Sequence, residues 1–171
     1  MHKPLQQLVN GIDRFNGWVG ETVSWLNLAM VLITFTIVLL RYGFQLNWIW
    51  LQESVTYMHA LVFMAGAAYT FRDEAHVRVD IFYRRFSERG KAIVNLVGGL
   101  VLLLPMVIFL ALVSFDYVMM SWSLFEGSRE AGGLPFLYLM KSYILIMAGL
   151  LFLQGIASIG RSILALRGGV A

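Results

Sequence analysis

Four long apolar runs without a charged side chain divide this chain, and they limit its fold more than any other feature. The runs cover residues 22–40, 54–71, 92–115 and 142–160, and charged residues flank each of them. About 20 apolar residues are needed for a helix to cross a hydrocarbon core roughly 30 Å thick. A water-soluble domain could not bury a chain that is 59% hydrophobic, because much of its surface must face water. We therefore expect an integral membrane protein.

The predicted fold class is all-α, with four transmembrane helices in one membrane domain over residues 1–171. The expected spans are 22–41, 51–71, 92–121 and 136–161, and Pro105 predicts a kink in the third. The loops between the later spans are expected at 72–91 and 123–135. Over residues 4–19, apolar side chains recur at helical spacing opposite a polar face. This pattern predicts a short amphipathic helix in the membrane interface.

Basic residues predict the orientation of the spans. With both termini on one side, that side holds ten basic residues: Lys3, Arg14, Arg72, Arg78, Arg84, Arg85, Arg89, Lys91, Arg161 and Arg167. The other side holds only Arg41, Arg129 and Lys141. Cytoplasmic loops carry an excess of Lys and Arg. We therefore expect cytoplasmic termini, a cytoplasmic 72–91 loop and a periplasmic 123–135 loop, in a multi-pass membrane protein.

Several kinds of chemistry have no support in the sequence. There are no cysteines, and the three histidines, His2, His59 and His76, are scattered. The glycines at 127 and 132 lack the Lys and Ser/Thr that complete a phosphate-binding loop. The net charge of +3 is modest and is better explained by membrane sidedness than by nucleic-acid binding. We therefore expect no enzymatic activity, no cofactor and no metal site.

Four ionisable residues are expected together at the periplasmic ends of the helices: Arg41, Glu53, Asp116 and Lys141. Two positive and two negative groups in one layer favour ion pairs that tie helix ends together. The alternative is an ion or proton path, which would place acidic groups deeper in the membrane. Only His59 and Gln154 lie that deep, so ion pairing is the preferred interpretation.

The order of motifs resembles the small membrane subunit of a TRAP transporter, the DctQ-type subunit of the tripartite ATP-independent periplasmic family. Trp48 and Glu53 open the second span, small residues follow around Gly66, and Arg72 leads into the segment from His76 to Asp80, HVRVD. A long third helix and a Gly-Leu-Pro sequence at 133–135 come next. The HVRVD segment after a helix that begins near a glutamate is the most specific element of the resemblance.

The resemblance implies an auxiliary role in sodium-coupled import of an organic acid or similar solute. A periplasmic binding protein would deliver the solute to a large multi-span subunit, and this chain would brace the static scaffold of that subunit. The resemblance also implies that residues 1–171 form one small-permease domain in the bacterial inner membrane, where membrane lipids would surround both subunits. The resemblance makes Arg72, His76, Arg78 and Asp80 a family motif at the cytoplasmic boundary. We expect Asp80 to pair with Arg72 or Arg78 and to fix the turn before the third helix.

The periplasmic connector and two other functions complete the expectations. Glu126, Arg129 and Glu130 are candidates for docking the binding protein, and Pro135 suits the first position of the fourth helix. One alternative function is a small homodimeric four-helix exporter with Glu53 as its proton-binding carboxylate. Another is a membrane anchor for a redox complex.

Overall fold

The chain forms a bundle of long helices in a computed structural model, which describes residues 2–73, 83 and 85–168. The helices are α1 (His2–Gly43), α2 (Ile49–Arg72), α4 (Glu88–Val97), the π-helical η1 (Gly98–Leu103), α5 (Leu104–Ser123) and α6 (Leu137–Leu166). The described residues contain no strand. The all-α fold class predicted from the sequence is therefore confirmed.

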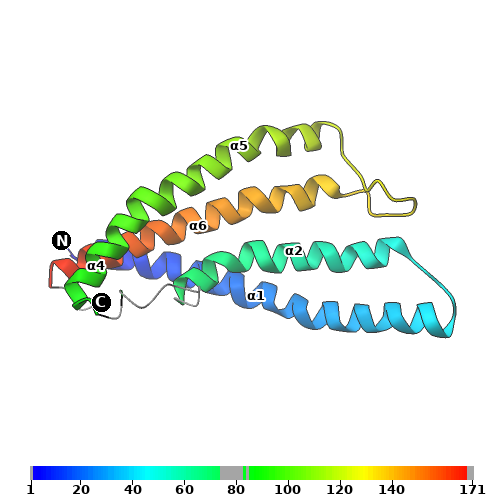
Figure 1. Cartoon of the computed structure of the whole chain (residues 1–171), viewed down its shortest axis with the longest axis horizontal. Helices are drawn as coiled ribbons and strands as arrows, with labels where there is room; N and C mark the ends of the chain where they lie inside the picture. The colour runs from blue at the N-terminus through cyan, green and yellow to red at the C-terminus, as the bar shows by residue number, and fades with distance from the viewer. Residues whose placement is uncertain (1, 74–82, 84, 169–171) are drawn as a thin grey trace.

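Helix α6 lies at the centre of the bundle. It contacts α1, α2, α4, η1 and α5, whereas α1 and α5 lie on opposite sides of it (Figure 1). The start of α1 and the end of α6 lie at the same end of the long axis, which we call the terminal end. The connectors between α1 and α2 and between α5 and α6 lie at the opposite end, the loop end.

The first helix differs from its prediction. Residues 4–19 do not form a separate short helix, because α1 continues without interruption from His2 to Gly43 over 42 residues. The polar face of this segment is used for packing, since Asn16 is 1% exposed and contacts α6 through its side chain. Contacts to α6 thus hold the segment in line with the rest of α1, whereas an interfacial helix would lie across the membrane surface.

Among the described residues, three helices are long and apolar enough to cross a membrane: 3–43 in α1, 88–123 across α4, η1 and α5, and 137–166 in α6. Helix α2, with 24 residues, is not one of them. Polar side chains at Gln52, Glu53 and His59 lower its hydropathy. Three helices thus support the prediction that the chain crosses the membrane more than once.

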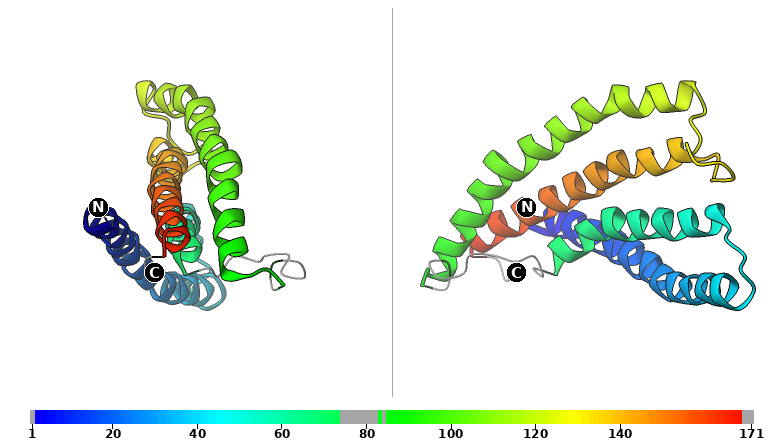
Figure 2. Two further views of the ribbon diagram at one scale, coloured as in Figure 1. Left: turned by 90° about the vertical axis from the view of Figure 1, so that its left-hand side faces the viewer. Right: turned by 45° about the vertical axis from the view of Figure 1, so that its right-hand side comes forward.

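Helices α4, η1 and α5 follow one another directly and form one long helical segment. This segment curves along its length (Figure 2), and it contains a proline. Pro105 has no N–H for the carbonyl four residues earlier, and its ring crowds that carbonyl. The turn before it widens, and the N–H of Leu104 donates to the carbonyl of Gly99, five residues back. The expected kink is therefore spread over a π-helical segment.

The bundle buries small residues and exposes large ones. Ala65 and Ala68 of α2 pack with Leu150 of α6 in the core. Large apolar side chains face outward, with Trp25 72%, Leu102 71% and Leu112 70% exposed. Such a surface is stable when lipid is the solvent, because helix association in membranes depends on close packing and not on hiding apolar groups from water.

Candidate functional site

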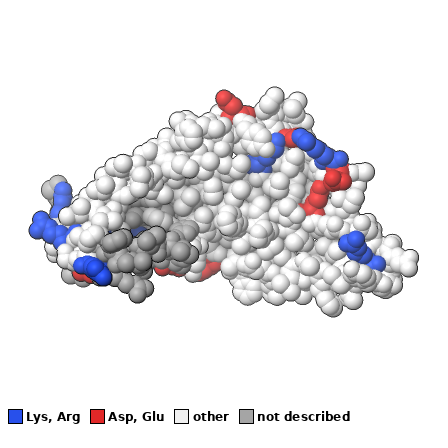
Figure 3. Space-filling view, viewed as in Figure 1, with Lys and Arg blue, Asp and Glu red and all other residues white. Residues whose placement is uncertain are grey.

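Polar interactions concentrate at the two ends of the bundle. Figure 3 shows the Lys and Arg atoms of the visible face mostly toward the ends of the long axis. At the loop end, a loop-end cluster comprises Glu53, Ser121, Glu126, Ser128 and Lys141. Toward the terminal end, a terminal-end network comprises Asp13, Asn16, Arg72, Gln154 and Arg161. We describe the loop-end cluster first.

Glu53, in the first turns of α2, holds the connector between α5 and α6. The hydroxyl of Ser128 donates to its Oε1, and the backbone N–H of Leu134 donates to its Oε2 at 2.6 Å. Gly133 lies so close that a Cβ there would be 2.7 Å from Oε2. The connector also bonds to itself, with the N–H of Ser128 donating to the carbonyl of Leu134 at 2.9 Å. One carboxylate from α2 thus organises a loop that lies 75 residues further along the chain.

Glu126 joins the end of α5 to the start of α6. It pairs with Lys141 and accepts a hydrogen bond from the hydroxyl of Ser121 at 2.7 Å. The hydrogen bond from Lys141, followed by that from Ser121, lowers the pKa of Glu126 below its usual value. The Lys141 ammonium also lies 4.1 Å from the ring centroid of Tyr117, a cation–π contact.

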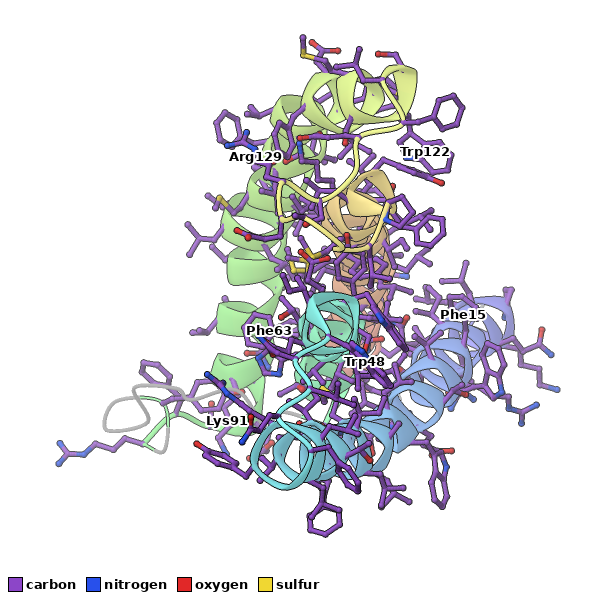
Figure 4. All side chains as sticks on the ribbon, turned by 90° about the vertical axis from the view of Figure 1, so that its right-hand side faces the viewer. Phe15, Trp48, Phe63, Lys91, Trp122 and Arg129 are labelled. Carbon is purple, nitrogen blue, oxygen red and sulfur yellow. The ribbon has the colours of Figure 1, made fainter. Side chains whose placement is uncertain are left out.

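The other predicted docking residues of the connector face solvent. Arg129 and Glu130 are exposed, whereas Glu126 is half-buried in its pair with Lys141. Figure 4 shows Arg129 and Trp122 on opposite sides of the connector. The indole N–H of Trp122 donates to Ser142 Oγ at 2.8 Å and so anchors the other side.

The predicted layer of ion pairs among Arg41, Glu53, Asp116 and Lys141 is not what the described residues form. Lys141 pairs with Glu126, and Glu53 binds a hydroxyl and a backbone amide. Arg41 and Asp116 are exposed and make no ion pair within the described part of the chain. The partners of Lys141 and Glu53 come instead from the connector between α5 and α6: Glu126 for Lys141, and Ser128 and Leu134 for Glu53.

Asp13 is the centre of the terminal-end network. Its Oδ2 accepts from Arg161 Nη1 at 2.6 Å, and its Oδ1 accepts from Gln154 Nε2 at 2.8 Å. Its backbone carbonyl accepts from Arg72 Nη1 at 3.1 Å. Asp13 of α1 therefore bonds to both α2 and α6.

Asn16 extends this network into the bundle. Its Nδ2 donates to Gln154 Oε1 at 2.6 Å and to the carbonyl of Leu150 at 3.4 Å. Asn16 and Gln154 are 1% and 0% exposed. Burying an amide costs least when its polar atoms find partners; Asn16 Nδ2 and both polar atoms of Gln154 have them, whereas Asn16 Oδ1 is buried without one. The pairing therefore sets the register between α1 and α6.

Arg72, the first residue of the predicted family motif, ends α2. Its Nε pairs with Asp73 Oδ1 at 2.7 Å, and its guanidinium carbon lies 4.6 Å from the Tyr69 ring centroid. The hydrogen bond from Arg72 lowers the pKa of Asp73. The expected partner Asp80 and the motif residues His76 and Arg78 lie outside the described residues.

Sequence reasoning missed most of the terminal-end network. It placed residues 4–19, which include Asp13, in an interfacial helix, and noted Gln154 only as a deep polar residue. A signal was present: α6 places Gln154 and Arg161 seven residues apart, and α1 places Asp13 and Asn16 three residues apart. Each spacing puts two polar groups on one helix face, and the two faces are complementary.

Within the described residues, three helices long and apolar enough to cross a membrane, with Lys and Arg side chains mostly toward the bundle ends, define the class: a multi-pass helical membrane protein. The family model described as "Tripartite ATP-independent periplasmic transporters, DctQ component" matches residues 30–165. The chain therefore belongs to the DctQ family of TRAP transporter components, which confirms the resemblance seen in the sequence. This is a family of transporter components and not of enzymes. No curated protein and no solved structure matches the chain.

Proposed function

We propose that this chain is the small membrane subunit of a sodium-coupled TRAP transporter that imports an organic acid or a similar solute. The family match over residues 30–165 carries this proposal. The chain would bind the static scaffold of a large multi-span subunit and brace it, while a periplasmic binding protein delivers the solute. Specificity and sodium coupling would then belong to those partners.

The outer surface of the bundle supports a bracing role. Helix α5 lies at one side of the bundle and packs on α6. Its outward side chains are large and apolar, including Phe109, Leu112, Val113 and Met120, each more than 60% exposed. Such a surface suits the flank of another membrane helix as well as lipid.

The proposed topology has four spans, with both termini in the cytoplasm of a bacterium and the loop end in the periplasm. The basic-residue asymmetry supports this orientation. Helix α2, the second in chain order, would complete the set of four spans, because it runs beside α1 and α6 in the bundle. An even number of spans also agrees with the start of α1 and the end of α6 lying at one end.

Co-purification tests the proposed partnership. We expect the tagged chain, co-expressed with the large TRAP subunit of the same organism, to elute from a detergent column as a one-to-one complex. Reconstituted with the binding protein, that complex should take up solute only under a sodium gradient. Transport by the chain alone, as a homodimer, would refute the proposal and favour the exporter alternative.

The connector is proposed to receive the binding protein through Arg129 and Glu130, with Glu126 holding the base of the connector. Charge reversal of both exposed residues, Arg129→Glu with Glu130→Arg, preserves net charge. We expect weaker uptake at limiting binding protein and unchanged assembly with the large subunit. A control outside the connector is Asp116→Asn, at an exposed acidic residue of α5. Equal uptake by the double variant and wild type across a binding-protein titration would exclude this docking surface.

The motif residues Arg72, His76, Arg78 and Asp80 are proposed to fix the turn before the third span. Exchanging Arg78 and Asp80 keeps the loop charge and therefore the topology. If the motif is structural, the exchange lowers the thermal stability of the complex or its uptake. If the motif serves topology alone, both quantities match wild type.

A further inference from the structure

A polar hollow opens at the terminal end, between the end of α2, the start of α4 and the last turns of α6. Its volume is about 360 Å³. The polar side chains around it are Tyr83, Glu88, Lys91, Asn95, Ser158, Arg161 and Ser162. Figure 3 shows basic atoms gathered at this end of the molecule. The hollow therefore offers two cations and one carboxylate together with neutral hydrogen-bonding groups.

An apolar groove adjoins this hollow on the membrane side. Its volume is about 450 Å³, and Val94, Leu102, Leu103 and Met106 line it. The groove passes the π-helical turn, where Gly98 and Gly99, the first two residues of η1, carry no side chains. The hollow and the groove share Phe71, Asn95 and Ser158 in their linings. One site thus has a polar, cationic part and an apolar part that follows a helix into the membrane.

The two cations of the hollow are held in position by acidic residues. Lys91 Nζ lies 2.7 Å from Glu88 Oε1, and Glu88 is 90% exposed at its side chain. Arg161 uses Nη1 for its 2.6 Å pair with Asp13, and a guanidinium has five N–H donors in all. Arg161 can therefore be oriented by its acidic neighbour and still meet an anion, and Lys91 lines the same hollow. A phosphate ester is the anion expected at a membrane boundary.

We propose that this chain binds one glycerophospholipid, with its phosphate in the polar hollow near Lys91 and Arg161 and an acyl chain in the groove along Gly98–Leu103. The continuity of a cationic hollow with an apolar groove carries this assignment, which goes beyond the role of the chain as a transporter subunit. A free phosphate would use only the hollow, and a partner helix would use only the groove. Only an amphiphile uses both parts.

Native mass spectrometry of the full chain, delipidated in mild detergent, tests the site. The titrated probes are phosphatidylglycerol, diacylglycerol and inorganic phosphate. We expect one phosphatidylglycerol to bind at a concentration where neither other probe does. Equal binding of inorganic phosphate would mean that the hollow is a simple anion site, and equal binding of diacylglycerol would mean that the hollow contributes nothing. Loss of bound lipid when the large subunit is present would assign the groove to that partner. Each of these three results would overturn the proposal.

Paired variants test the two parts separately. Lys91→Gln and Arg89→Gln each remove one positive charge from α4, but only Lys91 lines the hollow. We expect Lys91→Gln to weaken binding about fivefold and Arg89→Gln to leave it unchanged. Equal effects would show nonspecific charge attraction and would refute the site.

Gly98→Leu tests the groove. A Cβ at Gly98 would meet no atom within 4 Å, so a side chain there would fill the groove without a clash. Gly149→Leu is the control, because Gly149 is a helical glycine with equally open space. We expect Gly98→Leu to prevent binding of phosphatidylglycerol and Gly149→Leu to retain it, with both variants folded by circular dichroism. Full binding by a folded Gly98→Leu protein would overturn the proposed acyl site.

Discussion

Asp13 and Arg161 form an ion pair, with Oδ2 and Nη1 2.6 Å apart, that joins the first and last helices across 148 residues of sequence. The same carboxylate accepts a hydrogen bond from Gln154, so it joins two turns of α6 to one turn of α1. The side chains of Asp13 and Arg161 are 24% and 34% exposed. This partial shielding from water makes the pair stronger than one on an open surface.

Asp13→Asn should lower the stability of the bundle. The new amide keeps one acceptor oxygen and turns an NH2 donor toward either Arg161 or Gln154, so one of the two hydrogen bonds is lost and Arg161 no longer faces a negative charge. We expect a loss of about 1–2 kcal/mol, which corresponds to a melting temperature about 2–8 °C lower, measured by fluorescence-detected thermal unfolding in detergent. Glu21→Gln also removes a carboxylate from α1, at an exposed position, and should change stability by less than about 0.5 kcal/mol. Matching losses in the two variants would contradict a specific role for the pair.

Gly20→Ala and Gly11→Ala should have opposite effects on stability. A Cβ at Gly20 would lie 2.4 Å from Tyr69 Cγ, so α1 and α2 would have to separate; overpacking of this kind costs about 1–3 kcal/mol. A Cβ at Gly11 would meet nothing within 4 Å, and alanine favours a helix by about 0.5–1 kcal/mol. Thermal unfolding of the two variants checks the signs. A stabilised Gly20→Ala protein would show that α1 and α2 are not in close contact there.

The Glu126–Lys141 pair should make stability depend on pH in the acidic range. The pKa of Glu126 is lower in the folded protein than in the unfolded chain, because of its hydrogen bonds from Lys141 and Ser121. Its stabilisation is therefore complete above the ordinary glutamate pKa of about 4.3 and is lost as the pH falls through the folded-state pKa. Glu126→Gln should remove this part of the pH dependence of the melting temperature, and Glu130→Gln should not. A wild-type profile identical to that of Glu126→Gln would disprove the linkage.

Glu53→Gln should loosen the connector between α5 and α6 without unfolding the bundle. The neutral amide weakens the charge-assisted hydrogen bonds from Leu134 N–H and the Ser128 hydroxyl, each worth about 1.5–3 kcal/mol. Hydrogen–deuterium exchange of the Leu134 amide should accelerate by about 10–100-fold. Asp116→Asn, at an exposed position of α5, should leave the exchange rate unchanged. Unchanged exchange in Glu53→Gln would mean that the connector holds its shape by itself.

Prediction from the sequence succeeded for features that depend on one continuous stretch of the chain. The apolar runs indicated the helices, because a segment that crosses lipid must be long and apolar whatever its neighbours are. The HVRVD segment and its flanking motifs identified the family, because they lie along one stretch of chain. The prediction for Pro135 was slightly wrong: α6 begins at Leu137 with Phe136 as its cap. The boundary depends on how the connector is held by Glu53, which is a tertiary contact.

Which side chains pair with one another, in contrast, could be learned only from the tertiary structure. The sequence by itself determined a helical membrane protein of the DctQ family, since composition, periodicity and motif order are properties of the chain. It could not determine that Lys141 pairs with Glu126, that Glu53 holds Ser128, or that Asp13 meets Arg161. Several carboxylates lie at similar depths, and a side-chain pair forms only within about 4 Å. The crossing of α1 and α6 and the path of the connector decide which groups come that close.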